Sequence, residues 1–355
     1  MAQPTIARPE TETFVRNVWY IAALRSEVGE SLLGRTILGI SVVLYRTRAG
    51  KVAALRNRCP HRGYPLTEGK LGDDDVIACG YHGFRFGPDG TCLSVPGQDK
   101  IPGRSDVRSF PVTENGPFVW IWMGDPELAD PAGIPAETGF ADPDFRFVSG
   151  NVVIDANHEL IADNVLDLSH ESFIHATKIG TREVAETPIT SSSSESRWLV
   201  QASRIMRDVE CPPTYRERTG LRSPIDREQH INFFVPSLYV LDTMVVAAES
   251  RHDPADGPRR AYHGKVIYGL TPLSERQTHY FFAIGRDYAQ DDPEMDASVQ
   301  EGQLCLIDED AYAVGVLQNL MDTEGPEFEV SIRLDTAALI ARRMLARRLR
   351  AEAKG

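Results

Sequence analysis

The chain lacks the features that mark several classes of protein. Its 355 residues include only five cysteines, too few for a disulfide framework, so a reducing, cytoplasmic location is expected. No stretch approaches 18 consecutive apolar residues, so the sequence predicts no membrane-spanning helix and no membrane partner. Residues 1–13 have no apolar core of the kind found in signal peptides, and we expect them to form a flexible tail.

Basic residues are also in deficit. The chain carries 38 Lys and Arg against 51 Asp and Glu, a formal net charge of −13. This balance argues against nucleic acid as a partner, because nucleic-acid binding depends on basic side chains that neutralise phosphates. Hydrophobic residues at 42% and charged residues at 25% are instead typical of a globular enzyme.

The pattern of elements predicts two domains. From Thr36 to about Trp122 the chain reads as short strands separated by turns, and GPDG at Gly87–Gly90 as a hairpin turn. A Pro- and acid-rich stretch near residues 125–148 reads as a linker. Helical patterns then cover about 156–175, 293–320 and 332–352. Strand-like runs cover 196–206, 230–247, 261–270 and 278–286. Residues 191–194 read as a polar loop. We predict an all-β domain over residues 14–128 and an α+β domain over 129–355.

Four metal-ligand residues lie in the first domain. Cys59 and His61 form C-P-H, and after seventeen residues Cys79 and His82 form C-G-Y-H. Zinc is one alternative, although zinc fingers usually pair like ligands, and unligated core residues are another. Here each pair supplies one Cys and one His in the same order, which favours a [2Fe–2S] cluster with two thiolates on one iron and two imidazoles on the other.

Around these residues the chain resembles the Rieske non-haem iron oxygenases, in their terminal oxygenase component. The resemblance rests on RNRCPHRGYPLTEGKLGDDDVIACGYHGFRFGPDG and on the earlier NVWYIAAL, residues 17–24. It implies a second domain with a helix-grip (START-like) fold, an antiparallel sheet and a mononuclear iron. No GxGxxG-like nucleotide fingerprint is visible, so we expect electrons from a separate NAD(P)H-dependent reductase or ferredoxin.

A second set of candidate ligands lies in ADNVLDLSHESFIHATKIG. His170 and His175 are five residues apart, about 140° around an ideal helix, so both reach one metal only if the helix ends or distorts between them. The alternative is a pair of half-buried histidines on an amphipathic helix. Two His and one carboxylate is the usual ligand set of an oxygen-activating Fe(II). The resemblance implies that the carboxylate is Asp310, with Asp308 as the substitute.

The resemblance also assigns roles around this iron. It implies that Asp167 bridges His82 of one subunit to His170 of the next, which requires a head-to-tail ring such as a homotrimer. Asn164 matches a family position near the iron. His263 roughly matches a substrate-contacting histidine in some members, and an ordinary surface histidine is the equal alternative.

The likeness is strongest to the members that demethylate aryl methyl ethers, the vanillate and dicamba O-demethylases. It covers DNVLDLSHESFIHATKIGTREVAETPI and GRDYAQDDPEMD, residues 285–296. It implies monooxygenation by O2 of a methoxylated aromatic acid to the phenol and formaldehyde. Hydroxylation of a ring, methyl or N-methyl group is the first alternative. A Rieske electron carrier without oxygenase activity is the second, and a zinc-binding structural protein the third.

Overall fold

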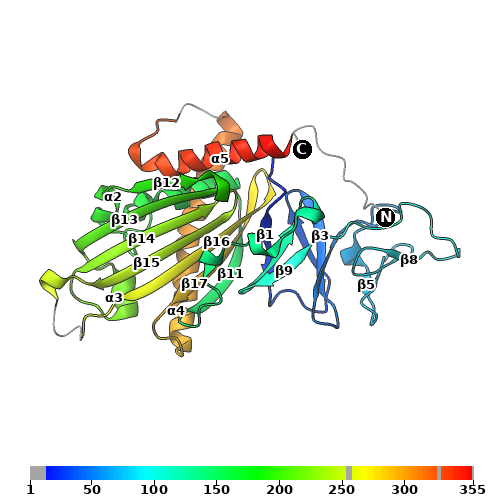
Figure 1. Ribbon diagram of the computed structural model, residues 1–355, viewed down its shortest axis with the longest axis horizontal. Helices are drawn as coiled ribbons and strands as arrows, with labels where there is room; N and C mark the ends of the chain where they lie inside the picture. The colour runs from blue at the N-terminus through cyan, green and yellow to red at the C-terminus, as the bar shows by residue number, and fades with distance from the viewer. Residues whose placement is uncertain (1–12, 253–257, 326–328, 354–355) are drawn as a thin grey trace. The chain divides into compact units, whose positions relative to one another are not determined.

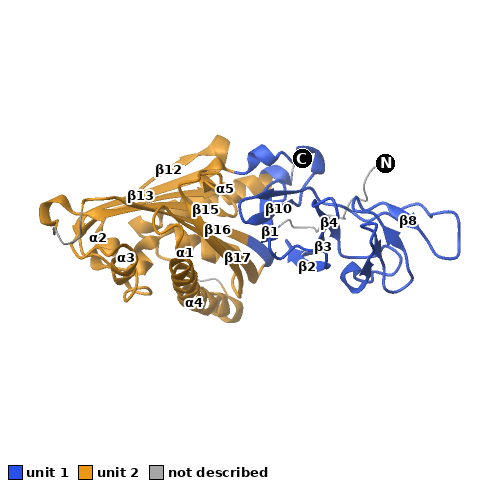
Figure 2. Ribbon diagram, turned by 90° about the horizontal axis from the view of Figure 1, so that it is seen from below, with its two compact units in different colours: residues 1–134, 271–274, 351–355 blue, residues 135–270, 275–350 orange. Residues whose placement is uncertain are grey.

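The chain forms two compact units, each described here by itself. The computed structural model describes residues 13–252, 258–325 and 329–353, so the predicted tail lies outside the described residues except for Thr13. The first unit comprises described residues of 1–134, 271–274 and 351–355, and the second those of 135–270 and 275–350 (Figure 2). Among the described residues, no helix has both the length and the apolar composition needed to cross a bilayer.

The first unit consists of small antiparallel sheets. One has the order β1 (Trp19–Leu24), β10 (Phe118–Trp122), β9 (Val112–Asn115), and the next β2 (Leu33–Ile37), β3 (Ile40–Arg46), β4 (Val52–Arg56). The third has the order β5 (Lys70–Leu71), β6 (Ile77–Ala78), β7 (Arg85–Phe86), β8 (Cys92–Ser94). Its last two strands are joined by the predicted turn, in which the Gly90 amide donates to the Gly87 carbonyl at 2.9 Å. These strands are rich in β-branched and aromatic side chains, which pack into two buried clusters.

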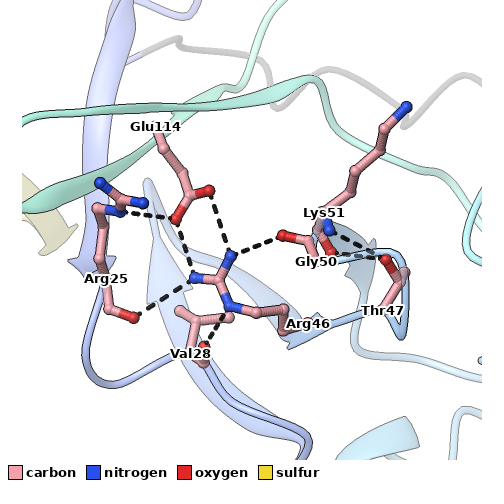
Figure 3. Close-up of polar contacts among 7 residues, drawn as sticks. All are labelled: Arg25, Val28, Arg46, Thr47, Gly50, Lys51 and Glu114. Atoms are coloured by element: carbon pink, nitrogen blue, oxygen red, sulfur yellow. Dashed lines mark hydrogen bonds and ion pairs between the residues drawn. The ribbon is translucent and has the colours of Figure 1, made fainter.

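Arg46, at the end of β3, ties together three segments of this unit (Figure 3). Its guanidinium donates to the Val28 carbonyl at 3.1 Å, to the Gly50 carbonyl at 2.9 Å, and to the Glu114 carboxylate at 2.9 and 3.2 Å. Hydrogen bonding to Arg46 is the main cause that holds the pKa of Glu114 below its usual range. The contacts fasten β3 to β9 and to the β1–β2 connection.

Segments from far along the chain complete the first unit. Thr271 Oγ1 donates to the Ile21 carbonyl at 2.7 Å. The Glu352 carboxylate accepts the backbone amides of Arg16 at 2.7 Å and Asn17 at 2.9 Å. Two pieces more than 130 residues downstream of residue 134 therefore satisfy backbone groups of β1 and of the segment before it.

The second unit is built on a seven-stranded antiparallel sheet (Figure 1). Its order is β11 (Arg146–Ile154), β17 (Gln277–Arg286), β16 (Tyr262–Ser274), β15 (Leu238–Ala247), β14 (Ile225–Phe234), β13 (Leu199–Val209), β12 (Thr190–Ser194). In β14 every second side chain is buried, the period of a strand with one covered face. This confirms the predicted α+β class.

Five α-helices are described: α1 (His158–Leu166), α2 (Arg182–Glu186), α3 (Pro213–Thr219), α4 (Pro293–Glu324) and α5 (Thr336–Glu352). All belong to this unit except the last two residues of α5, which belong to the first. Helices α1 and α4 pack side by side and α4 also contacts β11 (Figure 2). The Gln303 amide of α4 donates to the Tyr268 hydroxyl of β16 at 2.9 Å, so α4 covers the face of the sheet that carries Tyr268.

Two local predictions were wrong, and a third, a strand-like run, missed a turn. The helix predicted over 156–175 ends at Leu166, because Asp167 is extended and its carboxylate caps a 3-10 turn, Leu168–Ser172. The run 230–247 is a hairpin, in which β14 and β15 are separated by the turn that contains Pro236. The predicted loop at Ser191–Ser194 is part of strand β12, whose backbone pairs with β13 despite its polar side chains.

Candidate metal centres

Two loops of the first unit have the same backbone design. In the first, the Cys59 carbonyl accepts the Gly63 amide at 2.8 Å, and in the second the Cys79 carbonyl accepts the Gly83 amide at 3.0 Å. Both glycines have positive φ, +75° and +71°, a conformation that favours glycine. Each loop therefore turns back on itself directly after its Cys and His.

The four predicted cluster residues come together at the tips of these loops. The His61 and His82 rings lie 4.5 Å apart, and the thiols of Cys59 and Cys79 are close enough to interact. Burial and the nearby Cys79 thiol raise the pKa of Cys59 to about 11, since protonated thiols are favoured in a crowded apolar place. The two thiols are buried while both imidazoles are exposed. Paired thiols beside paired imidazoles fit the donor set of a Rieske cluster.

The surroundings of the loops leave little spare room. A Cβ at Gly80 would collide with the Glu68 carbonyl oxygen, and one at Gly83 would lie 3.2 Å from Pro96. Pro96 lies in SVPGQ, residues 94–98, which begins at the last residue of β8. This segment packs against the second loop. His61 also stacks on Phe84, with ring centroids 5.0 Å apart.

The second unit brings His170, His175 and Asp310 together. Ligand atoms of the three lie within 4.8 Å of one another. The Asp310 Oδ1 lies 3.2 Å from His175 Nε2 and 3.5 Å from His170 Nε2. The end of α1 at Leu166 makes this possible, because the two histidines then sit on a 3-10 turn and the loop after it.

The protonation pattern of these groups fits a bound cation. His175 Nδ1 faces Glu309 Oε2 at 2.7 Å and His170 Nδ1 faces the Asp167 carbonyl at 2.6 Å, so each Nδ1 carries a proton and donates. A neutral ring then points the lone pair of Nε2 at Asp310 Oδ1, which is buried and has no hydrogen-bond partner among the described residues. Three acceptors that face one another are the arrangement a divalent metal satisfies.

Without a bound cation, the nearby carboxylates favour the protonated, positively charged form of His175. Burial opposes its protonation, but Asp310 and Glu309 together raise the pKa of His175. Glu309 is in turn held by Lys178, whose Nζ lies 2.6 Å from Glu309 Oε1. The sequence analysis did not single out Glu309, because its contact with His175 becomes visible only in three dimensions.

A buried ion pair anchors the loop that carries both histidines. Glu171 and Arg227 of β14 are both almost fully buried, and the Arg227 guanidinium donates to Glu171 Oε2 at 2.8 Å. Gln229 donates to Glu171 Oε1 at 3.0 Å, and Arg227 also donates to the Ile179 carbonyl at 2.9 Å. These bonds fasten residues on both sides of His175 to the sheet.

Asp167 has two separate contacts. Its carboxylate accepts the Ser169 amide and hydroxyl, both at 2.9 Å, while its backbone carbonyl accepts from His170. Asn164 and Asp167 line a surface hollow together with His170 and Arg342. His170 thus separates this hollow from the main cavity, which it also lines.

The structure does not bring every predicted residue to the site. Asp308, the substitute for Asp310, is exposed and absent from the metal-binding cluster. His263 does not line the main cavity, and its exposed ring is bonded to Asp287 at 2.8 Å. The geometry gives no support to a substrate contact by His263.

A cavity opens beside the three candidate iron ligands. It is enclosed by α3, by the loop after α1, by strands β14 to β17 and by α4. Its wall includes apolar side chains, aromatic side chains and four cationic ones: Arg218, Arg227, Lys265 and Arg286. A concave site with an apolar wall and a few polar groups is suited to a small organic molecule.

Comparison with known families gives two matches. Residues 18–111 match the Rieske [2Fe-2S] domain, and residues 154–351 match the vanillate O-demethylase oxygenase C-terminal domain. The first match covers both cluster loops and the second covers the candidate iron ligands.

Similar proteins match over most of their length. The iron-sulfur subunit of a toluene-4-sulfonate monooxygenase system from Comamonas testosteroni is 32% identical, over 96% of this chain and 99% of the relative. The vanillate O-demethylase oxygenase subunit of Pseudomonas sp. strain HR199 is 32% identical, over 96% of each. The dicamba O-demethylase oxygenase component of Stenotrophomonas maltophilia is 37% identical, over 86% of this chain and 88% of the relative.

Solved structures give the same result. Dicamba monooxygenase bound to dicamba superposes with a TM-score of 0.86 at 32% identity, over 97% of this chain and all of that one. A structure of the same enzyme with non-haem iron and dicamba gives a TM-score of 0.80 at 33% identity, over 96% of this chain and 99% of that one. The predicted cofactor classes, a [2Fe–2S] cluster and a non-haem iron, agree with these matches. The chain therefore belongs to the Rieske non-haem iron oxygenases, as an oxygenase component of the vanillate O-demethylase type.

Proposed function

We propose that this oxygenase removes the methyl group of a methoxylated aromatic acid. The observation that carries the proposal is the cavity beside His170, His175 and Asp310, with its apolar wall and cationic residues. Relatives over most of the chain are named as O-demethylases of vanillate and dicamba. Hydroxylation of the methyl carbon yields a hemiacetal, which decomposes to the phenol and formaldehyde.

We assign the metals to the two converging sets of side chains. Cys59, His61, Cys79 and His82 would hold the [2Fe–2S] cluster, and His170, His175 and Asp310 the Fe(II). When bound, the cluster supplies single electrons and the iron supplies oxygen activation. We further propose that residues 14–128 form the electron-transfer domain and residues 129–355 the catalytic domain.

The chain's own residues have separate tasks in this proposal. The Asp167 carbonyl and the Glu309 carboxylate accept the Nδ1 protons of the two histidines and so orient Nε2 toward the metal position. The apolar cavity wall excludes water from the reacting methyl group. Asn164, in the hollow on the other side of His170, is proposed to help to position the α1 end.

Electron transfer is proposed to cross a subunit boundary. Asp167 would accept a hydrogen bond from His82 of a neighbouring subunit in a homotrimer. His82 is exposed on one loop tip and Asp167 lines a surface hollow, as such a contact requires. A separate reductase or ferredoxin is proposed as the electron donor, and the five free cysteines are consistent with the cytoplasmic location proposed.

A second candidate reaction is hydroxylation of an aryl methyl group. It is favoured by the relative from the toluene-4-sulfonate monooxygenase system, which matches 96% of this chain. The two candidates differ in their products, because only O-demethylation releases formaldehyde.

The test begins with anaerobic iron and sulfide analysis of the purified protein. Three irons and two sulfides per chain with a Rieske absorption spectrum are expected. Cys79→Ala should remove the cluster, while His175→Ala should leave the cluster and lower iron by one per chain. Two irons after addition of Fe(II) would favour an electron carrier, and zinc in a colourless protein would refute the assignment.

Turnover then tests the reaction and the bridge. With a surrogate reductase, methoxybenzoates should give phenol and formaldehyde in equal amounts, and hydroxymethyl products would favour the second candidate. Asp167→Asn should keep both metals yet slow reoxidation of the reduced cluster, because the hydrogen-bonded bridge is weakened. Normal reoxidation in this variant would refute the bridge.

A further inference from the structure

Three of the four cationic side chains that line the cavity are neutralised by carboxylates. Arg227 pairs with Glu171 at 2.8 Å, Arg286 pairs with Asp296 at 2.6 Å, and Lys265 pairs with Asp242. Arg218, on α3, forms neither a hydrogen bond nor an ion pair with any residue that the structure describes.

Arg218 sits in surroundings that disfavour a lone charge. Burial is the main cause that lowers the pKa of its guanidinium, and its electrostatic neighbours are Tyr288, Tyr215, Arg286 and Glu217. Glu217 is exposed on the same helix and forms no ion pair with Arg218. Desolvating a cation without a counter-ion costs stability, and a bound anion would remove that cost. An unpaired guanidinium that lines a ligand-sized cavity is therefore a candidate anion site.

The point at which Arg218 contacts α4 gives the distance along this helix from the guanidinium to the metal ligand Asp310. A Cβ at Gly302 of α4 would lie 2.6 Å from Arg218 Nη2, so the guanidinium rests against this residue. Gly302 precedes Asp310 by eight residues, which is about 12 Å along a helix axis. Between the two points Gln303 and Leu306 of α4 line the cavity, with Leu241 on the facing strand β15.

We propose that Arg218 binds the anionic group of the substrate, an aromatic carboxylate or sulfonate, and so selects the position of the reacting methyl group. An anion at Arg218 places a ring against the apolar middle of the cavity. A methoxy group in the meta or para position then points toward the metal ligands. One in the ortho position lies beside the carboxylate and stays near Arg218. The inference rests on the proposed oxygenase function and adds the substrate charge and geometry to it.

Binding measurements on the full-length holoprotein test the proposal without turnover. Calorimetric titrations under anaerobic conditions compare 4-methoxybenzoate with its neutral analogue 4-methoxybenzamide. We expect the acid to bind more tightly, and Arg218→Gln to weaken acid binding by about 30-fold or more while amide binding changes little. Arg218→Lys, which keeps the charge, should retain part of the preference for the acid.

A matched control lies two residues away on the same helix. Arg216 is exposed, does not line the cavity, and donates to the Cys211 carbonyl at 3.1 Å. Arg216→Gln removes the same charge from α3 and should leave acid binding within about twofold. Because Arg218 is unpaired, Arg218→Gln should also unfold at the same temperature as the wild type or higher, whereas loss of a structural arginine would lower it.

Several results would overturn the proposal. The wild type could bind the acid and the amide with equal affinity, or fail to bind the acid at millimolar concentration. Arg218→Gln could weaken acid binding and amide binding equally, or Arg216→Gln could weaken acid binding as much as Arg218→Gln does. Tighter binding of 2-methoxybenzoate than of the 3- and 4-methoxy isomers would refute the geometry. Arg218-dependent binding of 4-toluenesulfonate would extend the anion site to sulfonates. If 4-toluenesulfonate does not bind while the carboxylate does, the anion site is restricted to carboxylates.

Formaldehyde release separates this inference from the proposed function. Release from neutral methoxyarenes without preference for acids would refute the Arg218 site and leave O-demethylation standing. Arg218-dependent acid binding with no formaldehyde, but with hydroxylated product, would refute O-demethylation and leave the anion site standing.

Discussion

Replacing Glu171 by Gln should loosen the loop that carries the candidate iron histidines. The change keeps the shape of the side chain but leaves Arg227 with 2% of its side chain exposed and no carboxylate partner. Breaking a buried pair in this way costs about 3–5 kcal/mol. We expect the lower end, about 3 kcal/mol, because the substituted amide can still accept one hydrogen bond and Arg227 keeps the Ile179 carbonyl.

Hydrogen exchange with mass spectrometry measures this loss locally. A loss of about 3 kcal/mol corresponds to roughly 100-fold faster exchange of the amides in residues 168–180, provided that these amides exchange by local opening. Amides of the cluster loops should not change. Fe(II) binding should weaken as well, because the metal then has to order its own ligand loop.

A neighbouring ion pair supplies the matched control. Glu228, also on β14, accepts from Arg207 at 2.7 Å, but Arg207 has 55% of its side chain exposed. Glu228→Gln should change exchange by less than about 1 kcal/mol, as is usual for exposed pairs. If Glu171→Gln exchanges within threefold of the wild type, or no faster than Glu228→Gln, the buried pair does not anchor the loop.

Three other predictions concern the second unit. Glu309→Ala should weaken Fe(II) binding by about 10- to 100-fold in anaerobic titrations, because a histidine loses its orienting acceptor, whereas Asp308→Ala should not. Gly180→Ala should lower the iron content, since its Cβ would collide with the Glu171 carbonyl oxygen. In the control Gly315→Ala the new Cβ has nothing within 4 Å, so the melting temperature should rise slightly. Equal iron content in the two variants would contradict the predicted effect at Gly180. Burial lowers the pKa of His158 to about 4, so the unfolded state takes up the proton first as pH falls below about 6.5. The free energy of unfolding therefore falls by about 2 kcal/mol by pH 5. His158→Gln should therefore show a smaller drop in melting temperature between pH 7.5 and 5, and an unchanged drop would rule out this source of acid sensitivity.

The sequence was most informative where ligands are close neighbours in the chain. Cys59, His61, Cys79 and His82 could be grouped because each Cys–His pair lies within four residues and the loops carry glycines at the turns. The same holds for His170 and His175, where the spacing itself required an interruption of the helix. The interruption is a 3-10 turn capped by Asp167, a choice between local hydrogen bonds that periodicity alone does not reveal.

The remaining features depend on contacts between distant segments. Glu171 and Arg227 are 56 residues apart, and nothing in either local sequence predicts that two charges pair in the core. Arg218 gave no sequence signal, since an arginine on a short polar helix ordinarily lies on a solvated surface. The sequence likewise offered no sign that the ring of His263 is bonded to Asp287 and does not line the cavity.

The composition of the first unit has a consequence for synthesis in the cell. A ribosome that has released residue 134 has supplied every cluster ligand, but not Thr271 or Glu352, which bond to backbone groups near β1. The Ile21 carbonyl stays hydrated until 137 further residues have been translated, and the Arg16 and Asn17 amides until 218 have been. Final consolidation of the first unit therefore comes after synthesis of most of the second unit. Iron–sulfur assembly machinery would meet loops whose supporting unit is still incomplete. Premature termination upstream of residue 352 would leave that unit without the carboxylate that accepts the Arg16 and Asn17 amides.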